Sequence, residues 1–274
     1  MKYEWLSKKI DFVVLDIETT GLDKYYDEII EIGAIKYSNG KVIEELSFFI
    51  KPTIEVPTFI KQLTHITNKQ LSSGKSLKDG LLELIDFIED KPLVCHNSEF
   101  DILFIEHKLI DESMRSIRNL IYDTFDLSRI FLPYLNNHKL NTVADFFEIE
   151  NESSHRAISD AKTTGQLFIK LLDFIQKNTS LPINNHLLHI SDRAKIFSDI
   201  TDILQELVSH IRRNALLKGK DVKYQSPYFN IIENKKKTSK NITIDDCFDE
   251  DGLFATSIPN YELRKGQIEM SKAV

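Results

Sequence analysis

The chain has 274 residues, a formal net charge of −7, 42% hydrophobic residues and 28% charged residues. These values are typical of a globular protein with room for one full domain and a smaller region. The negative charge argues against a broad basic surface that coats duplex DNA. Two cysteines exclude a disulfide framework, and no apolar run approaches the ~18 residues that a membrane span needs. Because no apolar secretory segment follows Met1, we expect a cytoplasmic protein without a membrane partner.

The first chemical signal lies at the end of a predicted strand. The apolar run Phe12–Leu15 leads into Asp16 and Glu18, which are separated by one residue. Because residues i and i+2 of a strand point to the same face, the two carboxylates project together. Such carboxylates repel one another unless a cation neutralises them, and Mg²⁺ or Mn²⁺ prefers oxygen ligands of this kind. A strand end with two solvated acids is an equally good interpretation of this pair alone.

An antiparallel hairpin is predicted next. Residues 27–37, which are rich in Ile, and residues 42–50 predict two strands. Asn39-Gly40 between them is typical of a type I′ turn, because both central positions of that turn need positive φ. A short helix is expected over residues 58–63.

The segment Gly74-Lys75-Ser76 resembles part of a phosphate-binding loop. Position 69 is Lys where that loop needs Gly, and no strand precedes the segment. We therefore interpret Ser76 as a helix N-cap. The apolar positions that follow at helical spacing predict a buried stripe: Leu77, Leu81, Leu84, Ile85 and Ile88.

A third carboxylate follows a short buried strand over residues 92–95. Asp101 lies in the predicted first turn of the next helix, where it can face the same cleft as Asp16. An ordinary first-turn acid that favours the helix dipole is the alternative interpretation.

The last candidate residues lie at the start of a long amphipathic helix that ends near Lys177. His155 lies in the loop that leads into this helix, and Asp160 lies in its first turns. A lone His before a helix is usually just exposed to solvent. His155 is therefore a candidate site residue only because it accompanies the acids named above. Shorter helices are predicted over residues 125–131 and 140–147.

Four acids and one histidine stand in an order that resembles the DEDDh family of 3′→5′ exonucleases, and more closely its DnaQ-type proofreading group. The resemblance covers roughly residues 10–177. His65 is a departure, because the family usually has Gly at that position of its Leu-Thr-x-Ile-Thr element. The five residues are Asp16, Glu18, Asp101, His155 and Asp160, and the matching segments are 16–22, 63–67, 96–101, 123–129 and 155–161.

The resemblance implies an α/β fold, namely a ribonuclease H-like mixed five-stranded sheet flanked by helices. It also implies two Mg²⁺ (or Mn²⁺) ions, which activate a water nucleophile and stabilise charge on the scissile phosphate. Asp16 would bridge the ions, and His155 would act as the general base, since histidine can accept a proton near neutral pH. The implied metal ligands are Asp16, Glu18, Asp101 and Asp160.

The resemblance also implies a pocket for the 3′-terminal nucleotide, formed after the first strand and at the start of the helix that carries Asp101. For Phe100, plain core packing is an equal alternative. The implied substrate-binding residues are Ile17, Thr19, Thr20, Gly21, Leu22, His65, Asn97, Phe100 and His155.

We therefore expect a 3′→5′ exonuclease that releases nucleoside monophosphates from single-stranded DNA ends, with RNA ends also plausible and DNA repair or replication as the setting. Two other functions stay open. One is a non-catalytic module that tethers a 3′ end to a helicase, and the other is a polymerase proofreading subunit. DNA or RNA preference depends on the shape of the pocket, and the sequence does not indicate an oligomeric state.

Beyond the nuclease domain, expected over residues 1–178, we predict a helical and β linker region over residues 179–257. An amphipathic helix is predicted over residues 194–217. In the simpler interpretation it packs on the nuclease domain or on its own neighbours, and in the other it forms a dimer seam. Strands over residues 224–233 and 242–248 enclose a basic run, which is either a solvated loop or a nucleic-acid contact.

Residues 258–274 predict the start of a further domain. Within them, Ile258–Met270 resembles the adenine-reading Gln motif that opens the helicase part of DinG-type proteins, in which a DnaQ-like nuclease domain precedes the helicase. The resemblance implies a shortened bifunctional protein of this type. We expect no ATPase activity, because Gln267 alone cannot hold phosphates.

Overall fold

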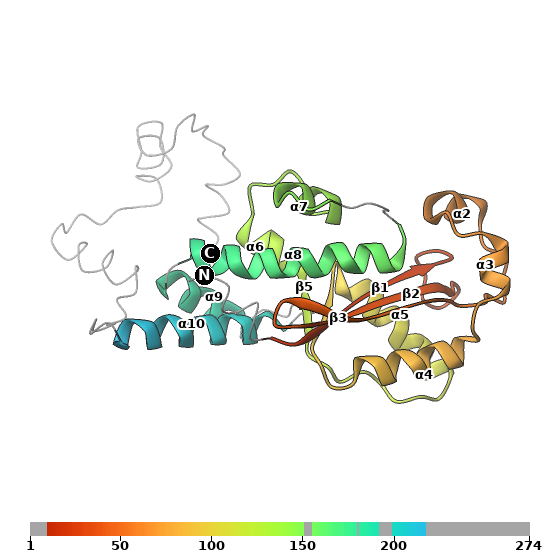
Figure 1. Cartoon of the computed structure of the whole chain (residues 1–274), viewed down its shortest axis with the longest axis horizontal. Helices are drawn as coiled ribbons and strands as arrows, with labels where there is room; N and C mark the ends of the chain where they lie inside the picture. The colour runs from red at the N-terminus through yellow and green to blue at the C-terminus, as the bar shows by residue number, and fades with distance from the viewer. Residues whose placement is uncertain (1–9, 151–154, 180, 192–198, 218–274) are drawn as a thin grey trace, which may run out of the picture. The chain divides into compact units, whose positions relative to one another are not determined.

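A five-stranded sheet forms the centre of the molecule. The computed structural model describes residues 10–150, 155–179, 181–191 and 199–217, which lie within one compact unit, Met1–Val222. The strand order is β3-β2-β1-β4-β5, and β1 pairs antiparallel with β2 and parallel with β4 (Figure 1). The expected mixed five-stranded sheet is therefore confirmed. The strands are β1 (Phe12–Thr19), β2 (Ile29–Ser38), β3 (Lys41–Phe49), β4 (Leu93–Cys95) and β5 (Ile121–Asp123).

Helices cover both faces of the sheet. On one face lie α4 (Leu77–Ile88) and α5 (Ser98–Asp111), and on the other lies α8 (Ala157–Asn178). The shorter helices α6 (Thr124–Phe131) and α7 (Leu140–Phe146) join α8 on its face (Figure 1). Each face has its own buried apolar cluster, so two layers of core enclose the sheet.

The alternation of side chains along β1 decides which face carries the acids. Leu15 packs into the cluster of α4 and α5, whereas Val14 packs into the cluster of α8. Because alternate residues of a strand share a face, Asp16 and Glu18 point to the side of α8. The strand therefore directs both carboxylates toward the helix that carries Asp160.

Local signals in the sequence set one turn and one helix start as predicted. Asn39 and Gly40 both have positive φ, 52° and 72°, which confirms the β2–β3 hairpin turn. The Ser76 Oγ accepts a hydrogen bond from the Asp79 backbone N–H at 3.1 Å, so Ser76 caps α4 as predicted.

The departure at His65 has a conformational explanation. His65 ends α2 (Thr58–Thr64) with φ at 57°, in the left-handed region that glycine adopts most readily. The next helix, α3 (Asn68–Ser72), was not predicted. Thr67 and Gln70 form a capping box, which is the sequence signal for its start.

The helices after α8 complete one of the two cores. α9 (Leu181–Ser191) was not predicted, and α10 (Ile200–Leu217) is the described part of the helix expected over residues 194–217. Its apolar stripe is buried in the cluster of α8, which confirms packing on the nuclease fold. The buried residues of the stripe are Ile200, Ile203, Leu204, Leu207 and Val208.

Asp199 joins α10 to the edge of the sheet. Its backbone N–H donates to the Ile121 carbonyl at 2.6 Å, and its Oδ2 accepts from the Ile121 N–H at 2.7 Å. Among the described helices, none is long and apolar enough to cross a membrane. The strands predicted over residues 224–233 and 242–248 and the motif at 258–270 lie outside the described residues.

The start of α8 lies directly against β2 at Gly33. Gly33 pairs with Asp16 across the two strands, and a Cβ at position 33 would come within 3 Å of backbone atoms of Ala157 and Ile158. Only a residue without a side chain allows this close approach. Gly33 thus brings the first turn of α8 to the part of β1 that carries the acids.

We expect Gly33→Ala to lower the free energy of unfolding by about 2 kcal/mol, because its methyl group would push the start of α8 away from the sheet. Urea unfolding measures this loss. Ser47→Ala is the control, since Ser47 pairs with Gly33 on the other side and is exposed; its effect should stay within about 0.5 kcal/mol. Equal stability of Gly33→Ala and the wild type would contradict this packing.

Candidate active site

The structure brings acids from β1 and α8 together with His155. Glu18, Asp160 and His155 each offer a ligand atom, and these atoms lie within 4.8 Å of one another. Asp160 Oδ2 also accepts a hydrogen bond from the His155 backbone N–H at 2.9 Å. Two elements about 140 residues apart in sequence therefore form one cluster of oxygen and nitrogen donors.

Asp101 reaches the same cluster from α5. Its Oδ1 accepts a hydrogen bond at 3.2 Å from the backbone N–H of Ile17, the residue between Asp16 and Glu18. The bond ties the first turn of α5 to the end of β1. All four predicted acids and His155 are thus placed at one end of the sheet.

Burial and mutual repulsion raise the pKa values of these carboxyl groups. For Glu18, burial is the largest cause and Asp160 and Glu31 add to it, which raises the pKa to about 8 against the opposing effect of Arg156. Burial, followed by repulsion from Asp101 and Asp160, likewise raises the pKa of Asp16 well above its ordinary value. The pKa of Asp101 is raised chiefly by burial.

This donor set fits divalent cations. A crowded group of carboxylates has pKa values this high only while nothing positive neutralises it. A hard cation with oxygen ligands favours the ionised forms and removes the repulsion. Asp16, Glu18, Asp101 and Asp160 therefore have the chemistry that Mg²⁺ or Mn²⁺ requires.

A buried acid on β2, Glu31, holds the start of α8 and was not predicted. Its carboxylate is fully buried and accepts hydrogen bonds from Arg156 Nε and Nη2, the latter at 2.8 Å, and from the Ala157 backbone N–H at 3.2 Å. Glu31 also lies opposite Glu18 in the β1–β2 register. The signal that could have found it is a single acid inside an apolar run, because a buried acid needs a partner.

Asp123 stabilises the turn before α5. It lies in segment 123–129, which matches the exonuclease family but contributed no predicted site residue. Its carboxylate accepts hydrogen bonds from the backbone N–H groups of Asn97 at 2.9 Å and Ser98 at 2.7 Å. It also accepts from the Ser98 hydroxyl and from the Phe125 N–H. Asn97 has a φ of 72° in this turn, so Asp123 stabilises a strained backbone that leads into the helix of Asp101.

Three of the predicted substrate residues line one hollow of about 520 Å³. Leu22 comes from the loop after β1, and Asn97 and Phe100 come from the start of α5. Phe100 is half-buried and packs on Phe104, with 5.5 Å between the ring centroids. Phe100 therefore both packs on the core and faces the hollow.

The other predicted substrate residues lie differently. The Ile17 side chain is buried in the core. The Thr19 hydroxyl donates to the Gly21 carbonyl at 2.5 Å, and the Thr20 hydroxyl donates to Asp27 at 2.9 Å. These side chains shape the loop after β1. His65 is exposed at the end of α2 and is not among the residues that line the hollow.

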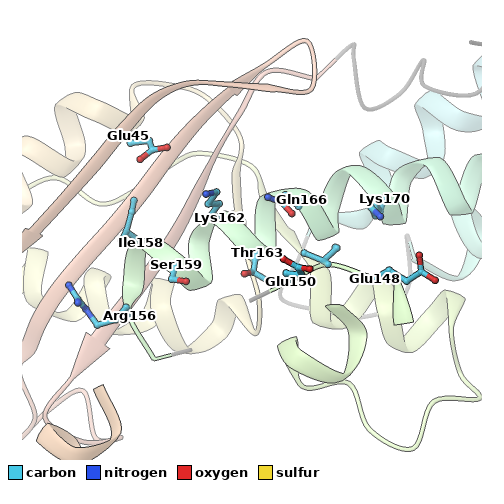
Figure 2. A pocket seen from close by; sticks show the side chains of 11 residues that line it. Glu45, Glu148, Glu150, Arg156, Ile158, Ser159, Lys162, Thr163, Gln166 and Lys170 are labelled. Carbon is cyan, nitrogen blue, oxygen red and sulfur yellow. The ribbon is translucent and has the colours of Figure 1, made fainter. Parts of the chain in front are cut away.

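A second cavity, of about 590 Å³, lies along α8 and the edge of β3 (Figure 2). Figure 2 shows Arg156 and Ser159 at one end and Gln166 and Lys170 further along the helix. The residues that line it include none of the four acids. The hollow of about 520 Å³ also has none of them among its lining residues. We therefore place the chemistry at the end of the sheet from the contacts of the acids themselves rather than from either cavity.

Most of the sheet and half of α8 fall within the span of a known family. A family model described as Exonuclease (RNase_T) matches residues 13–168. A DNA polymerase III PolC-type protein of Caldanaerobacter subterraneus subsp. tengcongensis is 40% identical over 167 residues, which are 61% of this chain and 12% of that protein. The PolC-type protein of Clostridium perfringens is 38% identical over 157 residues, 57% of this chain and 11% of that one. The chain thus matches only about an eighth of the length of these relatives, which are polymerases rather than DinG-type proteins.

Solved structures share the fold at low sequence identity. E. coli exonuclease I in complex with a dA16 oligonucleotide has a TM-score of 0.55 and 17% identity, covering 66% of this chain and 43% of that one. Cell-death related nuclease 4 has a TM-score of 0.53 and 12% identity, covering 60% of this chain and 64% of that one. At these identities the likeness shows a common fold.

We expect Mn²⁺ to raise the melting temperature more at pH 8 than at pH 6. The pKa of Glu18 is raised in the folded protein from 4.5 to about 8. Its contribution to stability is therefore complete below the unfolded value and is lost as the pH rises through 8. A bound dication removes this loss by favouring the ionised carboxylates. Melting curves at both pH values measure the difference, which should be several degrees, since 1 kcal/mol corresponds to about 2–4 °C.

The control for this experiment is Asp11→Asn, because Asp11 is exposed just before β1. It should respond to Mn²⁺ as the wild type does, whereas Asp16→Asn should gain little at either pH. An equal gain at pH 6 and pH 8 in the wild type would show that the carboxylates do not carry the effect.

We expect Arg156→Met to lower the free energy of unfolding by about 3 kcal/mol, because it leaves the buried Glu31 carboxylate without its charged partner. The double variant Glu31→Gln/Arg156→Met should recover part of this loss, since no unpaired charge remains. Urea unfolding of the single and double variants gives the coupling energy. Arg115→Met, at an exposed arginine, should change stability by no more than about 0.5 kcal/mol. A coupling near zero would mean that the ion pair does not hold the start of α8.

Proposed function

This chain belongs to the exonuclease family whose model matches residues 13–168, and from this premise we propose that it is a divalent-metal-dependent 3′→5′ exonuclease. Its substrate is a single-stranded DNA end, and its product is a nucleoside monophosphate. The convergence of Asp16, Glu18, Asp101 and Asp160 beside His155 is the observation that carries the proposal.

The four acids have the role of holding the metal ions. Glu18 and Asp160 lie closest to His155 in the described geometry, while Asp16 and Asp101 complete the acidic group. Two Mg²⁺ or Mn²⁺ ions bound there supply charge stabilisation and a strong nucleophile for phosphodiester hydrolysis. The chain itself contributes a rigid set of carboxylates fixed by β1, α5 and α8.

His155 has the role of general base. It is exposed, lies just before α8 with a φ of 66°, and its backbone N–H is bonded to Asp160. An exposed imidazole next to the acids can take a proton from the attacking water and pass it to solvent. Its exposed position also leaves it free to approach a bound strand end.

The hollow formed by Leu22, Asn97 and Phe100 has the role of holding the 3′-terminal nucleotide. Leu22 and Phe100 offer apolar surface to the base, and Asn97 offers an amide. Such a pocket accepts any of the four bases, because stacking and apolar contact do not distinguish them strongly. A strand end bound there would present its scissile phosphate to the ions that Asp16, Glu18, Asp101 and Asp160 would hold.

The likeness to PolC-type polymerases supports DNA as the substrate and supports a role in removing 3′ nucleotides during replication or repair. The chain matches the polymerases over only 11–12% of their length. Proofreading for a polymerase is therefore the favoured second function. A non-catalytic 3′-end binding module is less favoured, because every position of the acidic cluster is filled and His155 lies beside it.

The test is the shortening of a labelled oligonucleotide in Mn²⁺. We expect a 5′-labelled single strand to shorten stepwise from its 3′ end. Asp16→Asn and Asp160→Asn should reduce the rate more than 100-fold. Even loss of a residue that only orients a metal ligand typically lowers metal affinity or activity 10–100-fold. Asp11→Asn should cleave at the wild-type rate.

Three outcomes would contradict the proposal. One is stepwise shortening that persists in Asp16→Asn, and another is wild-type protein that binds the strand without shortening it. The third is release from the 5′ end, which a 3′-labelled strand would reveal.

A further inference from the structure

The hollow that Leu22, Asn97 and Phe100 line has six further lining residues. They are Asp23, Lys24 and Tyr25 of the β1–β2 loop and Glu99, Leu103 and Phe104 of α5. From Asn97 to Phe104 the helix advances by ~10 Å at 1.5 Å per residue, whereas stacked nucleotides of one strand are ~3.4 Å apart. The stretch of α5 that lines the hollow is therefore longer than the spacing of two stacked nucleotides.

The β1–β2 loop exposes large side chains at this place. Leu22, Tyr25 and Tyr26 are 87%, 65% and 81% exposed. Three such side chains within five residues form an apolar patch, and Leu22 and Tyr25 also line the hollow. An exposed apolar patch that continues into a binding hollow is typical of a surface that binds a ligand.

Hydrogen bonds hold this loop in one conformation. Asp23 Oδ1 accepts from the Tyr25 N–H at 2.9 Å, and the Lys108 Nζ of α5 donates to the Lys24 carbonyl at 3.0 Å. The Tyr25 ring also packs edge-on against His107, with 4.7 Å between the ring centroids. Because Tyr25 is already fixed, a base that stacks on it loses little conformational entropy of the protein.

A cation lies next to Tyr25, in a hollow that two acids, Asp23 and Glu99, also line. The Lys24 ammonium lies 5.4 Å from the centroid of the Tyr25 ring. An aromatic face beside a cation is the combination that binds single strands, since the base stacks and the phosphate meets the positive charge.

We propose that Tyr25 and Lys24 form a second nucleotide subsite of the nuclease. Tyr25 stacks on the base next to the 3′ end, and Lys24 binds the phosphate on its 5′ side. The proposal rests on the proposed function, because it takes the terminal nucleotide to lie at Leu22 and Phe100. It explains how a chain with a net charge of −7 can hold a strand upstream of the scissile bond.

Fluorescence tests the subsite without catalysis. A single strand carries 2-aminopurine at its penultimate position and a phosphorothioate linkage at its 3′ end, and it binds in Ca²⁺. Stacking quenches this fluorophore, so we expect quenching by the wild type and by Tyr25→Phe but not by Tyr25→Ala. Tyr134→Ala is the matched control, because Tyr134 is 63% exposed and is not among the residues that line the hollow. Equal quenching by Tyr25→Ala and the wild type would overturn the proposal.

Kinetics separate the subsite from the catalytic centre. On a 12-residue oligonucleotide, Tyr25→Ala should raise KM about 10-fold, within the range that one base–aromatic stack contributes, with kcat kept within about twofold. The p-nitrophenyl ester of thymidine 5′-monophosphate has no second nucleotide, so its hydrolysis should not change. An unchanged KM on the oligonucleotide, or an equal loss on the ester, would overturn the proposal. If the wild type hydrolyses neither substrate, the proposed function fails, while the fluorescence result still decides whether the subsite exists.

Discussion

The attachment of α8 to β2 is the constraint on which the acidic cluster depends. Glu31 is buried on β2 and accepts hydrogen bonds from Arg156 and from the Ala157 N–H, while Gly33 leaves room for the helix backbone. Breaking a buried ion pair leaves an uncompensated charge, so the start of α8 has one favourable position on the strand. Asp160 follows within one turn. The buried Glu31 thus fixes the place of Asp160, one of the proposed metal ligands.

The same attachment concentrates negative charge, and this opposes folding. Glu31 lies opposite Glu18 in the register and, with burial and Asp160, raises the pKa of Glu18 to about 8. Arg156 offsets only part of this, because its guanidinium is already bonded to Glu31. The rest of the fold must therefore tolerate a strained site, and the two apolar clusters on the faces of the sheet supply that stability. Such an arrangement suits a site for divalent cations, since bound cations would remove the repulsion between the carboxylates.

Sequence alone predicts the parts of this site that depend on local patterns. The period of two along β1 puts Asp16 and Glu18 on one face, and the N-cap at Ser76 follows from a neighbour three residues away. The order of the acids along the chain indicates the exonuclease family, and the family implies the five-stranded sheet. The partnership of Glu31 and Arg156 joins positions 125 residues apart, and neither spacing nor periodicity reveals such a pair. Which helix would approach which strand closely enough to form it depends on three-dimensional packing.

The uneven distribution of charge around the site indicates how a strand is held. The proposed metal ligands are acids, which repel phosphate in the absence of cations. The hollow offers a lysine at position 24 beside an aromatic ring. Binding by a few local contacts differs from binding by a broad basic surface, because it releases few counterions and depends less on salt. Stacking also acts on bases that are unpaired, whereas a duplex end keeps its bases within the helix. A subsite that acts by stacking is therefore consistent with the single-stranded substrate that we propose.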